Sequence, residues 1–519
     1  MSISVVGVVG AGAMGRGIVQ VLLQTGHEVY WLDSCSGATD QARATLQKIW
    51  QRMAEKGKCT ASDIEQWLGR MQLISELNEF AGCECLIEAI IESESEKREL
   101  FQTLESVVER ETILASNTSS LSITRLAASL RHPERFAGFH CFNPVPLMPL
   151  VEVIAGLRTR PEVIHTLEAL AQVMGMTAIR VSDTPGFLVN QVGRAYPIES
   201  AHLVSEGVAS PFEVDCILKE QAGFKMGPFE LMDLTGLDVT QPVTEILFRE
   251  HFCEPRYRPS VMMGLRRHAG LLGRKTSQGF YAYKEGDGAQ LSCAKGSISS
   301  PADSDVAGSL PARVWIAAED VPGREWLERL ISQSGVPLDQ GNQPSDDALV
   351  LLAPLGNDAT EMVTRLGLPG ARSIAVDTLM PLDRRRVIMP CLLAEPPAVA
   401  QALKLVGAGG VPVSLIQEST GFVSQRVLAL MVNQACELAQ QGVATPRDID
   451  RATRLALGYP QGPLEWGNQL GAERLLRILN SVFVLTGDSR YRSSAWLRRR
   501  AQMSLSLLTE EPRRHAWQD

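Results

Sequence analysis

Short apolar runs alternate with longer helical patterns over the first third of the chain. The first run, residues 3–9, is continuously apolar and rich in β-branched side chains, which is typical of a strand buried on both faces. A helix is predicted from Gly17 to Gln24, and a second strand over residues 28–33. Further strands are expected at residues 85–91, 112–118, 135–143 and 150–154, with an amphipathic helix over 93–111. This alternation predicts a mostly parallel sheet with helices on both faces.

The pattern changes after residue 186. From Phe187 to about Leu247 the sequence is helical in type, with Pro211 and Gly227-Pro228 as breaks. The segment from 285 to 310 is rich in Gly, Ser, Ala and Asp and predicts an exposed linker. Strands and helices then alternate again up to about Ile416, and a second helical region follows.

The two helical regions are copies of each other. Residues 186–236 match residues 421–471 at a constant offset of 235 without a gap. The identical positions include Gly186, Phe187, Gly207, Val208, Ala209, Pro211, Asp215, Gly223, Gly227, Pro228, Glu230 and Gly236 in the first copy. The chain is therefore predicted to be a duplication of a sheet domain followed by a helical domain.

The length of 519 residues corresponds to about three or four domains of ordinary size. We expect an α/β Rossmann-type domain, an all-α domain, a reduced Rossmann-like domain and a second all-α domain. The predicted boundaries are 1–184, 185–284, a linker at 285–310, then 311–415 and 416–510.

The composition narrows the class of protein. Hydrophobic residues make up 45% of the chain, which excludes wholesale disorder. A formal charge of −9 argues against a protein that coats nucleic acid or an anionic membrane. No window approaches the roughly 18 uninterrupted apolar residues of a membrane-spanning helix, and the N-terminal run lacks the positive leader of a signal peptide. The ten cysteines have no zinc-type spacing, so we expect reduced thiols, no metal site and a cytoplasmic protein.

A glycine motif joins the first predicted strand to the first predicted helix. In Gly10-x-Gly12-x-x-Gly15, the first glycine permits a tight turn, the second lets backbone approach a pyrophosphate, and the third allows close packing of helix on strand. The phosphates would lie on the free amides of the helix N-terminus. The second strand ends in Asp33, where a carboxylate binds a ribose 2′-hydroxyl, and no arginine follows until Arg43. The motif therefore predicts NAD rather than NADP.

A second group of residues is typical of acid–base chemistry. His140 lies near the end of a predicted strand, and Glu152 lies on the next strand after a proline-rich turn. A carboxylate beside an imidazole fixes its tautomer and makes it a better proton acceptor. On spacing alone, a purely structural His–Glu pair remains the competing interpretation.

Several motifs together resemble the 3-hydroxyacyl-CoA dehydrogenase family. The resemblance covers about residues 3–284, and the tandem layout is similar to a longer bacterial branch that includes 3-hydroxybutyryl-CoA dehydrogenases and the 3-hydroxyadipyl-CoA dehydrogenase of phenylacetate breakdown. It depends on the residues 10–15, Ser116-Asn117-Thr118-Ser119-Ser120-Leu121, His140-Cys141-Phe142-Asn143-Pro144-Val145-Pro146, Leu150-Val151-Glu152, Asp183–Asn190 and Gly227-Pro228-Phe229-Glu230-Leu231 with Asp233.

The resemblance implies a role for each matching residue. His140 would be the general acid/base with Glu152 as its partner, Ser119 would hydrogen-bond the substrate oxygen, and Asn190 would help to hold the acyl group. The residues implied at the cofactor are Gly10, Gly12, Ala13, Met14, Gly15, Asp33, Glu92, Lys97, Asn117, Asn143 and Lys275. Ser119, Thr45 and Arg52 are implied at the CoA substrate, although the basic segment 40–58 is as readily interpreted as a solvated helix face.

The second half lacks this chemistry. No glycine fingerprint follows the strand predicted at 314–317, and the acidic Glu319 and Asp320 would oppose a pyrophosphate. Gln425 stands where the first copy has Asn190, and the segment most similar to the His140 motif, residues 386–390, has no acid or base. We expect the second half to bind no dinucleotide and to pack as an internal pseudo-dimer partner, with a further homo-oligomer left open.

The function implied is the reversible NAD-dependent oxidation of (3S)-3-hydroxyacyl-CoA to 3-oxoacyl-CoA, in fatty-acid or phenylacetate-type degradation. The alternatives are another NAD-dependent hydroxyacid dehydrogenase, or a non-catalytic, crystallin-like NAD-binding protein. The length of the acyl tail and the presence of a carboxylate on it are left open. Arg194 and Arg266 are candidates for pairing with such a carboxylate.

Overall fold

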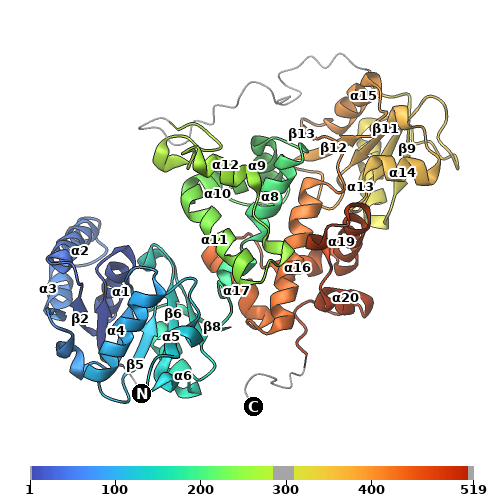
Figure 1. The fold of residues 1–519 in the computed structure, drawn as a ribbon. Helices are drawn as coiled ribbons and strands as arrows, with labels where there is room; N and C mark the ends of the chain where they lie inside the picture. Colours follow the sequence, from blue (N-terminus) through green and yellow to red (C-terminus); the bar gives the residue numbers. More distant parts are fainter. Residues whose placement is uncertain (1–2, 284–308, 512–519) are drawn as a thin grey trace. The chain divides into compact units, whose positions relative to one another are not determined.

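The computed structural model describes residues 3–283 and 309–511, so the predicted linker lies outside the described residues except for its last two positions. The chain forms two compact units (Figure 1). The first holds Met1–Gln191, Gln441–Leu457 and Glu510–Asp519, and the second holds Val192–Gln440 and Gly458–Thr509. No helix in the described part of the chain is long and apolar enough to cross a membrane.

The first unit contains an eight-stranded sheet in the order β3-β2-β1-β4-β5-β6-β7-β8. Its strands are β1 (Val5–Val9), β2 (Glu28–Leu32), β3 (Met71–Leu73), β4 (Cys85–Glu88), β5 (Ile113–Ser116), β6 (Phe136–Cys141), β7 (Leu150–Ala155) and β8 (Thr177–Ser182). The strands β3, β2, β1, β4, β5 and β6 all run parallel. Strand β7 pairs antiparallel with β6, and β8 runs parallel to β7. The mostly parallel sheet predicted from the sequence is confirmed.

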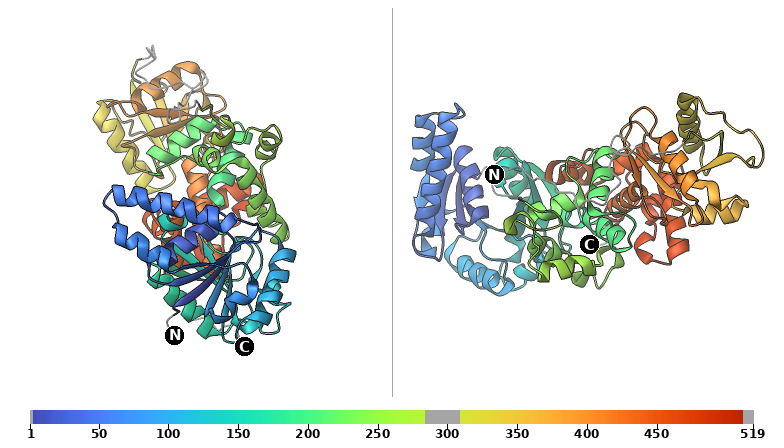
Figure 2. Two further views of the ribbon diagram at one scale, coloured as in Figure 1. Left: turned by 90° about the vertical axis from the view of Figure 1, so that its left-hand side faces the viewer. Right: turned by 90° about the horizontal axis from the view of Figure 1, so that it is seen from above.

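Helices cover both faces of this sheet (Figure 2). One face packs against α1, α2 and α6, and Ile18, Trp50 and Leu167 lie in that core. On the other face, Phe101 of α4 meets Phe136 edge to face. The helices of the first unit are α1 (Ala13–Gln24), α2 (Ala38–Glu55), α3 (Ala61–Gly69), α4 (Glu94–Val107), α5 (Ile123–Ala127), α6 (Pro161–Val173), α7 (Val189–Val192) and α17 (Pro446–Leu457).

The structure differs from the sequence expectation at β3, at β8, at the start of the first helix and at the end of β4. Strands β3 and β8 were not predicted, because β3 has only three residues and β8 alternates buried and exposed side chains at an edge of the sheet. The first helix begins at Ala13 rather than Gly17. Strand β4 ends at Glu88 rather than residue 91, because the Glu88 carboxylate accepts the amide hydrogen of Ile90 (2.7 Å) and turns the chain out of the sheet.

The second unit contains a five-stranded sheet in the order β13-β12-β11-β10-β9. Its strands are β9 (Arg313–Ala318), β10 (Ala348–Ala353), β11 (Ser373–Val376), β12 (Arg386–Pro390) and β13 (Val413–Leu415), and its flanking helices are α13 (Val321–Ser334), α14 (Ala359–Leu366) and α15 (Pro396–Val406). The antiparallel pair β11–β12 stands where the first sheet has β6–β7. The segment 386–390 is therefore the counterpart of β7, and its assignment to the His140 strand was wrong.

Both helical repeats contribute to the second unit. The first provides α8 (Ala195–Ser205), α9 (Pro211–Glu220), α10 (Pro228–Thr235), α11 (Leu237–Glu250), η4 (Pro255–Tyr257) and α12 (Val261–His268). The second provides α16 (Val423–Gln441), α18 (Pro463–Leu470), α19 (Ala472–Thr486), η7 (Ser489–Tyr491) and α20 (Ala495–Gln502).

The start of α10 shows why the repeated residues persist. The Asp215 carboxylate accepts the amide hydrogens of Phe229 (2.9 Å) and Glu230 (3.0 Å), so it caps this helix. A β-carbon at Gly227 would lie 2.2 Å from the Asp215 carboxyl carbon, so only glycine fits there. The repeat also preserves backbone geometry, since Gly236 and its counterpart Gly471 have φ of 90° and 92°.

Contacts between the two repeats occur in reciprocal pairs, as expected for a pseudo-two-fold axis. In the last part of the repeats the offset is 234, because η4 (Pro255–Tyr257) corresponds to η7 (Ser489–Tyr491). Tyr491 donates to Glu199 (2.6 Å), and Gln434, the counterpart of Glu199, donates to Tyr257, the counterpart of Tyr491 (2.5 Å). Arg258 likewise binds Asp488 (2.6 Å), while the equivalent arginine and acid, Arg492 and Glu254, lie 3.3 Å apart. A patch that meets its own copy in this way is the mark of an isologous interface.

Each sheet also bonds to the helical repeat of the other half. In the first unit the amide of Ser182, at the end of β8, donates to the carbonyl of Val443 (2.9 Å). In the second unit the amide of Gln417, just after β13, donates to the carbonyl of Val208 (2.9 Å). The two bonds join equivalent positions, because Gln417 and Val443 lie 235 residues after Ser182 and Val208. Each sheet domain therefore contacts the helical repeat of the other half of the chain as well as being connected to its own.

Candidate active site

The turn between β1 and α1 can accept only glycine at two of its three fingerprint positions. Gly10 has a φ of 112°, and a β-carbon there would lie 2.4 Å from the carbonyl oxygen of Ala89. At Gly15 a β-carbon would lie 2.0 Å from the carbonyl oxygen of Gly10, so helix α1 packs directly on the turn. At Gly12 no atom lies within 4 Å of that position, so this side of the turn is open.

These residues fit a dinucleotide. Gly12 caps α1 without a side chain, and the first-turn amides of a helix have no partner within it. They are therefore available to a phosphate, and the helix dipole favours one there. Asp33, just after β2, accepts the amide hydrogen of Ala11 (2.6 Å) and is tied to the same turn. The predicted fingerprint residues, with Ala13 and Met14 in that first turn, are brought together.

Beside this turn lies a buried ion pair that the sequence analysis did not single out. Glu88, at the end of β4, accepts from Lys97 (2.5 Å) and from Ser116 (2.6 Å), and both charged residues are almost wholly buried. Burial raises the pKa of Glu88. The available signal was a glutamate inside an otherwise apolar predicted strand, because such a residue is rarely buried without a partner.

Lys97 also binds Glu92 (3.3 Å), which organises the loop after β5. Glu92 accepts from the hydroxyl of Thr118 (2.7 Å) and from the amides of Ser119 (2.8 Å) and Ser120 (3.2 Å). Burial alone would raise the pKa of Glu92, but the charge of Lys97 and these hydrogen bonds outweigh it and lower the pKa. Glu92 therefore holds the predicted substrate serine in place.

His140 and Glu152 are cross-strand neighbours on β6 and β7. Nδ1 of His140 lies 2.6 Å from Oε2 of Glu152, and the two residues are 5% and 0% exposed. The other oxygen of Glu152 accepts the amide hydrogens of Leu188 (3.0 Å) and Val189 (2.8 Å). An ionised carboxylate only accepts, so Nδ1 carries the proton and Nε2 keeps its lone pair for a proton of another molecule.

The next residue along the chain connects this pair to the serine loop. Asn190 follows the two amides that bind Glu152, and its amide group donates to the carbonyl of Ser119 (3.3 Å). Phe142 and Phe187 lie beside the imidazole, with ring centroids 4.5 Å and 5.9 Å from it. The four residues predicted to do the chemistry thus belong to one connected arrangement in the first unit.

The remaining predicted cofactor residues are less closely grouped. Asn117 accepts the amide hydrogen of Cys141 (2.8 Å) and so links β5 to β6. Asn143 is exposed on the turn after β6. Lys275 lies in the second unit, where it pairs with Asp238 (2.8 Å). The roles of these three residues stay predictions.

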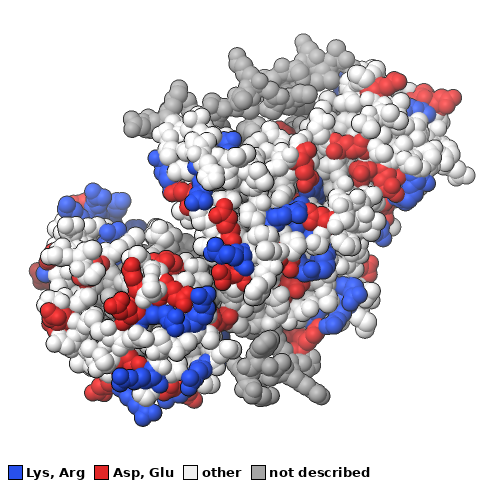
Figure 3. Space-filling view, viewed as in Figure 1, with Lys and Arg blue, Asp and Glu red and all other residues white. Residues whose placement is uncertain are grey.

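The residues predicted to contact CoA lie on α2. Thr45 donates its hydroxyl to the carbonyl of Gln41 (2.9 Å), and Arg52 is exposed in the last turn of the helix. Figure 3 shows basic side chains gathered at the end of the first unit where Figure 1 places α2. An exposed basic surface suits the phosphates of CoA, and the CoA contacts of Thr45 and Arg52 stay predictions.

Asp183 is a second residue whose role the sequence did not show. Its carboxylate accepts from the hydroxyl of Ser122 (2.8 Å) and from the amides of Ile123 (3.0 Å) and Thr124 (2.7 Å). It therefore ties the segment after β8 to the start of α5. The signal was present in the Asp183-Thr184-Pro185-Gly186 run, but its partner could be identified only from the fold.

The fold and the site together define a class of protein. A glycine turn at a helix N-terminus, an acid after β2, and a His–Glu pair at the same edge of the sheet are the parts of a dinucleotide-dependent dehydrogenase. Comparison with known proteins defines the family.

Residues 5–184 match the family model described as "3-hydroxyacyl-CoA dehydrogenase, NAD binding domain". Residues 186–283 and 421–506 both match "3-hydroxyacyl-CoA dehydrogenase, C-terminal domain", so the predicted duplication of the helical domain is confirmed. The chain belongs to the 3-hydroxyacyl-CoA dehydrogenase family and is an NAD-dependent oxidoreductase of that family.

Among its relatives, the 3-hydroxyadipyl-CoA dehydrogenase of Escherichia coli K12 is 33% identical over 503 residues, which are 96% of this chain and 98% of the relative. The probable 3-hydroxybutyryl-CoA dehydrogenase of Deinococcus radiodurans is 41% identical over 277 residues, which are 53% and 99% of the two chains. A crystal structure of 3-hydroxybutyryl-CoA dehydrogenase from Escherichia coli K12 matches with a TM-score of 0.84 at 33% identity, and covers 97% of this chain and 99% of that chain.

Proposed function

We propose that this chain reversibly oxidises (3S)-3-hydroxyacyl-CoA to 3-oxoacyl-CoA, with His140 as the proton acceptor. The observation that carries the proposal is the buried pair of His140 and Glu152, 2.6 Å apart on neighbouring strands of the NAD-binding sheet. A histidine buried for structural reasons alone would be more commonly satisfied at both nitrogens, whereas here the geometry leaves Nε2 for a substrate.

The residues that would hold NAD are those of the glycine turn, the first-turn amides of α1 and Asp33. Bound NAD supplies the acceptor for the hydride that leaves C3. Glu92 and Lys97 are proposed near its nicotinamide ribose, and Asn117, Asn143 and Lys275 are proposed as further residues around the cofactor. Because Asp33 carries a negative charge where a 2′-phosphate would lie, this chain should discriminate against NADP.

Nε2 of His140 accepts the hydroxyl proton of the substrate as the C–H bond at C3 breaks. The Glu152 carboxylate stabilises the imidazolium so formed, and two backbone amides keep that carboxylate in place. Ser119 and Asn190 orient the oxygen and the acyl group, so that C3 is aligned before the reaction begins. In the reverse direction His140 returns the proton to the oxygen.

The acyl group is proposed from the relatives. The Escherichia coli relative that spans nearly the whole chain is named for 3-hydroxyadipyl-CoA, and the Deinococcus relative for 3-hydroxybutyryl-CoA. We propose a short acyl chain within this range, and a place in the degradation of fatty acids or of phenylacetate-type aromatic compounds. CoA contacts are proposed for Thr45 and Arg52, and a reducing, cytoplasmic setting for the described cysteines, which form no disulfide.

The second half is proposed to be a scaffold without a cofactor site. Its sheet domain, residues 311–415, and helical domain, 416–510, would replace the second subunit of a two-fold dimer, as 1–184 and 185–284 form the active half. The reciprocal contacts of the two repeats support this reading, which leaves a homo-oligomer open.

The test combines turnover with binding. The purified full-length protein should reduce acetoacetyl-CoA with consumption of NADH, and titration calorimetry should find one NADH site per chain. NADH binding without any reduction of acetoacetyl-CoA would favour a non-catalytic NAD-binding protein. Two NADH sites per chain would contradict a scaffold role for the second half.

A further inference from the structure

Arg194, at the N-terminal end of α8 in the second unit, has no counter-ion among the residues that the structure describes. Its Nε is shielded from solvent and makes no hydrogen bond in that part of the chain. The side chain as a whole is only half-buried, so part of it is open to solvent. Burial lowers the pKa of Arg194, yet an arginine stays charged at neutral pH. A partly desolvated cation of this kind favours an anionic partner.

A second unpartnered polar group lies near this charge. Tyr459 is 6% exposed, its hydroxyl has no hydrogen-bond partner in the described chain, and its phenol group is close enough to the Arg194 guanidinium for an electrostatic interaction. Aromatic neighbours fix its position: the rings of Phe224 and Tyr196 lie 5.5 Å and 6.2 Å from it. Those two rings stack on each other at 4.4 Å. An aromatic wall thus holds a hydroxyl that has no partner in the described chain, and this hydroxyl interacts with the Arg194 cation.

We propose that Arg194 and Tyr459 form a binding site for a carboxylate. A guanidinium offers parallel N–H donors that match the two oxygens of a carboxylate, and the phenol adds a third donor. The proposal rests on the proposed function, because an enzyme of acyl-CoA esters meets carboxylates in two forms. One is the far end of a dicarboxylyl acyl tail, and the other is a free carboxylic acid.

Of the two arginines that the sequence analysis named for a carboxylate, only Arg194 makes no side-chain hydrogen bond or ion pair in the described part of the chain. The other candidate, Arg266, is already used within the fold: it donates to the carbonyl of Gly279 and lies 4.5 Å from the ring centroid of Phe280. Arg194 is therefore the arginine available to a ligand.

The test compares two esters with six-carbon acyl chains, 3-hydroxyadipyl-CoA and 3-hydroxyhexanoyl-CoA, which differ only in the terminal carboxylate. Arg194→Met should lower kcat/KM for the adipyl ester by about 10- to 100-fold, the usual effect of losing hydrogen bonds to a charged group, and leave the hexanoyl ester within about 3-fold. Tyr459→Phe should lower it by about 3- to 10-fold. Arg249→Met removes an exposed arginine of the same helical repeat and should change neither value.

A second arm separates the two sources of carboxylate. If free adipate alters the turnover of the hexanoyl ester in the wild type and not in Arg194→Met, while discrimination between the esters is unchanged, the ligand is the free acid. An equal fall for both esters would assign Arg194 to the shared CoA part and overturn the proposal, as would no change with either ester or with adipate. A wild-type protein that oxidises neither ester would instead refute the proposed function.

Discussion

The two sheet domains of this chain share a topology but differ at the carboxyl ends of their strands. In the first, the turn before α1 is made of glycines, and the space beside Gly12 is open. In the second, the helix that follows β9 is capped by Asp320, whose carboxylate accepts the amide hydrogen of Gly323 (2.8 Å). Arg474 of α19 binds the same carboxylate (2.5 Å) and donates to the carbonyl of Thr378 (3.0 Å).

The two domains differ in what lies at the N-terminus of their first helix: the second has a side chain of the protein where the first would take a cofactor phosphate. A helix N-terminus needs an anion or an acceptor, and the second domain supplies Asp320 where the first leaves room for a pyrophosphate. Glu319, next to it, accepts from the amide of Leu355 (2.7 Å) and from Arg365 (2.6 Å). These two acids, predicted to oppose a pyrophosphate, are occupied by internal contacts, which supports the prediction that no dinucleotide binds there.

The pair Asn190 and Gln425 shows the same change. Asn190 reaches one carbonyl, that of Ser119. Gln425, its counterpart in the second repeat, donates to the carbonyl of Pro354 (2.9 Å) and to Asp377 (3.1 Å) and accepts from the amide of Gly356 (2.8 Å). One additional methylene lets the side chain join three segments, so a residue proposed to orient substrate has become a structural link.

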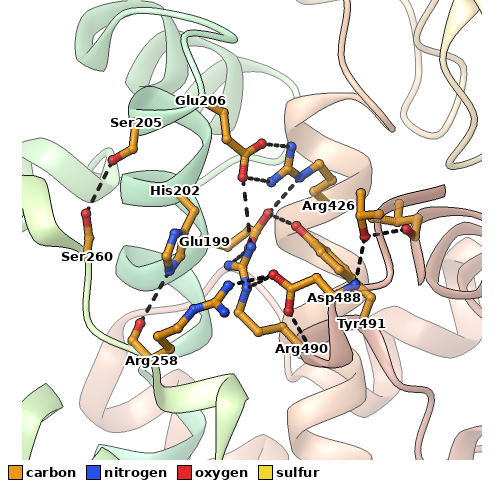
Figure 4. A network of polar contacts seen from close by, with 12 residues as sticks. Glu199, His202, Ser205, Glu206, Arg258, Ser260, Arg426, Asp488, Arg490 and Tyr491 are labelled. Carbon is orange, nitrogen blue, oxygen red and sulfur yellow. Dashed lines mark hydrogen bonds and ion pairs between the residues drawn. The ribbon is translucent and has the colours of Figure 1, made fainter. Parts of the chain in front are cut away.

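The interface between the repeats is asymmetric in charge. Glu199 binds Arg426 (2.7 Å), Arg490 (2.8 Å) and Tyr491 in a buried network (Figure 4). The two arginines lower the pKa of Glu199 against the opposing effect of burial. On the other side of the pseudo-two-fold axis, Gln434 makes a neutral contact with Tyr257. A duplicated interface can diverge in this way, whereas a true homodimer must keep both sides identical.

The largest expected effect is at the proposed base in the first half. His140→Ala should lower kcat by about 10²- to 10⁴-fold, the usual contribution of general acid–base catalysis, and leave NADH affinity nearly unchanged. Steady-state turnover of acetoacetyl-CoA and calorimetry with NADH measure the two quantities. Asp377→Asn, at the corresponding strand end of the second sheet, is the matched control and should not change kcat. Wild-type turnover by His140→Ala would refute the assignment.

The charged side of the interface should be the more sensitive one. Glu199→Gln removes the buried carboxylate that Arg426 and Arg490 share. Because Arg426 keeps Glu206 and Arg490 keeps Asp488, the free energy of unfolding should fall by about 2–3 kcal/mol, the effect of losing hydrogen bonds to charged groups. Gln434→Leu removes one neutral hydrogen bond and should cost about 1–2 kcal/mol. Denaturant titration of both variants measures the difference. Equal losses would mean that the charge asymmetry has no energetic consequence.

Substitution of Asp33 tests the cofactor site of the first sheet domain, because this residue is proposed to set the preference of the enzyme for NAD over NADP. Asp33→Ala should lower kcat/KM with NAD by about 10-fold, because a charged hydrogen bond to the ribose is lost, and should affect NADP less. The ratio of kcat/KM for the two cofactors is the measurement. A wild-type protein that uses both cofactors equally would contradict the role of Asp33. Asp320→Ala in the second sheet should leave this ratio unchanged.

The smallest expected effect concerns Asp377 of the second sheet domain and the dependence of its stabilisation on pH. Burial raises the pKa of Asp377 from 3.8 to about 6, and one of its oxygens has no partner within the described chain. The folded state therefore binds this proton more tightly than the unfolded state, so the stabilisation is complete below pH 4 and is lost as the pH rises through 6. At pH 8, Asp377→Asn should raise the Tm of the second unit by about 2–5 °C. If calorimetry finds the same Tm for variant and wild type at pH 8, Asp377 is not buried as an unpaired charge.

Much of the fold followed from local signals. The continuous apolar run at residues 3–9, the glycines at 10, 12 and 15, and the acid at 33 act over one βαβ unit, where spacing alone restricts the geometry. Pro211 and Pro228 each stand at the first position of a helix, as the predicted breaks required. The repeat was evident because the same helix caps and turns need the same residues in both copies.

The tertiary structure decided what depends on partners distant in the sequence. Glu88 and Asp183 had no visible role until β4, β5 and α5 were brought together, and the counterpart of the His140 strand could be identified only from the antiparallel pairing of β11 with β12. Whether a buried charge is paired likewise depends on the whole fold. Arg426 and Arg194 are indistinguishable as sequence, yet one is surrounded by carboxylates and the other has none among the residues that the structure describes. A charge in a chain has no environment until packing supplies one, and that environment decides whether it stabilises the fold or is left for a ligand.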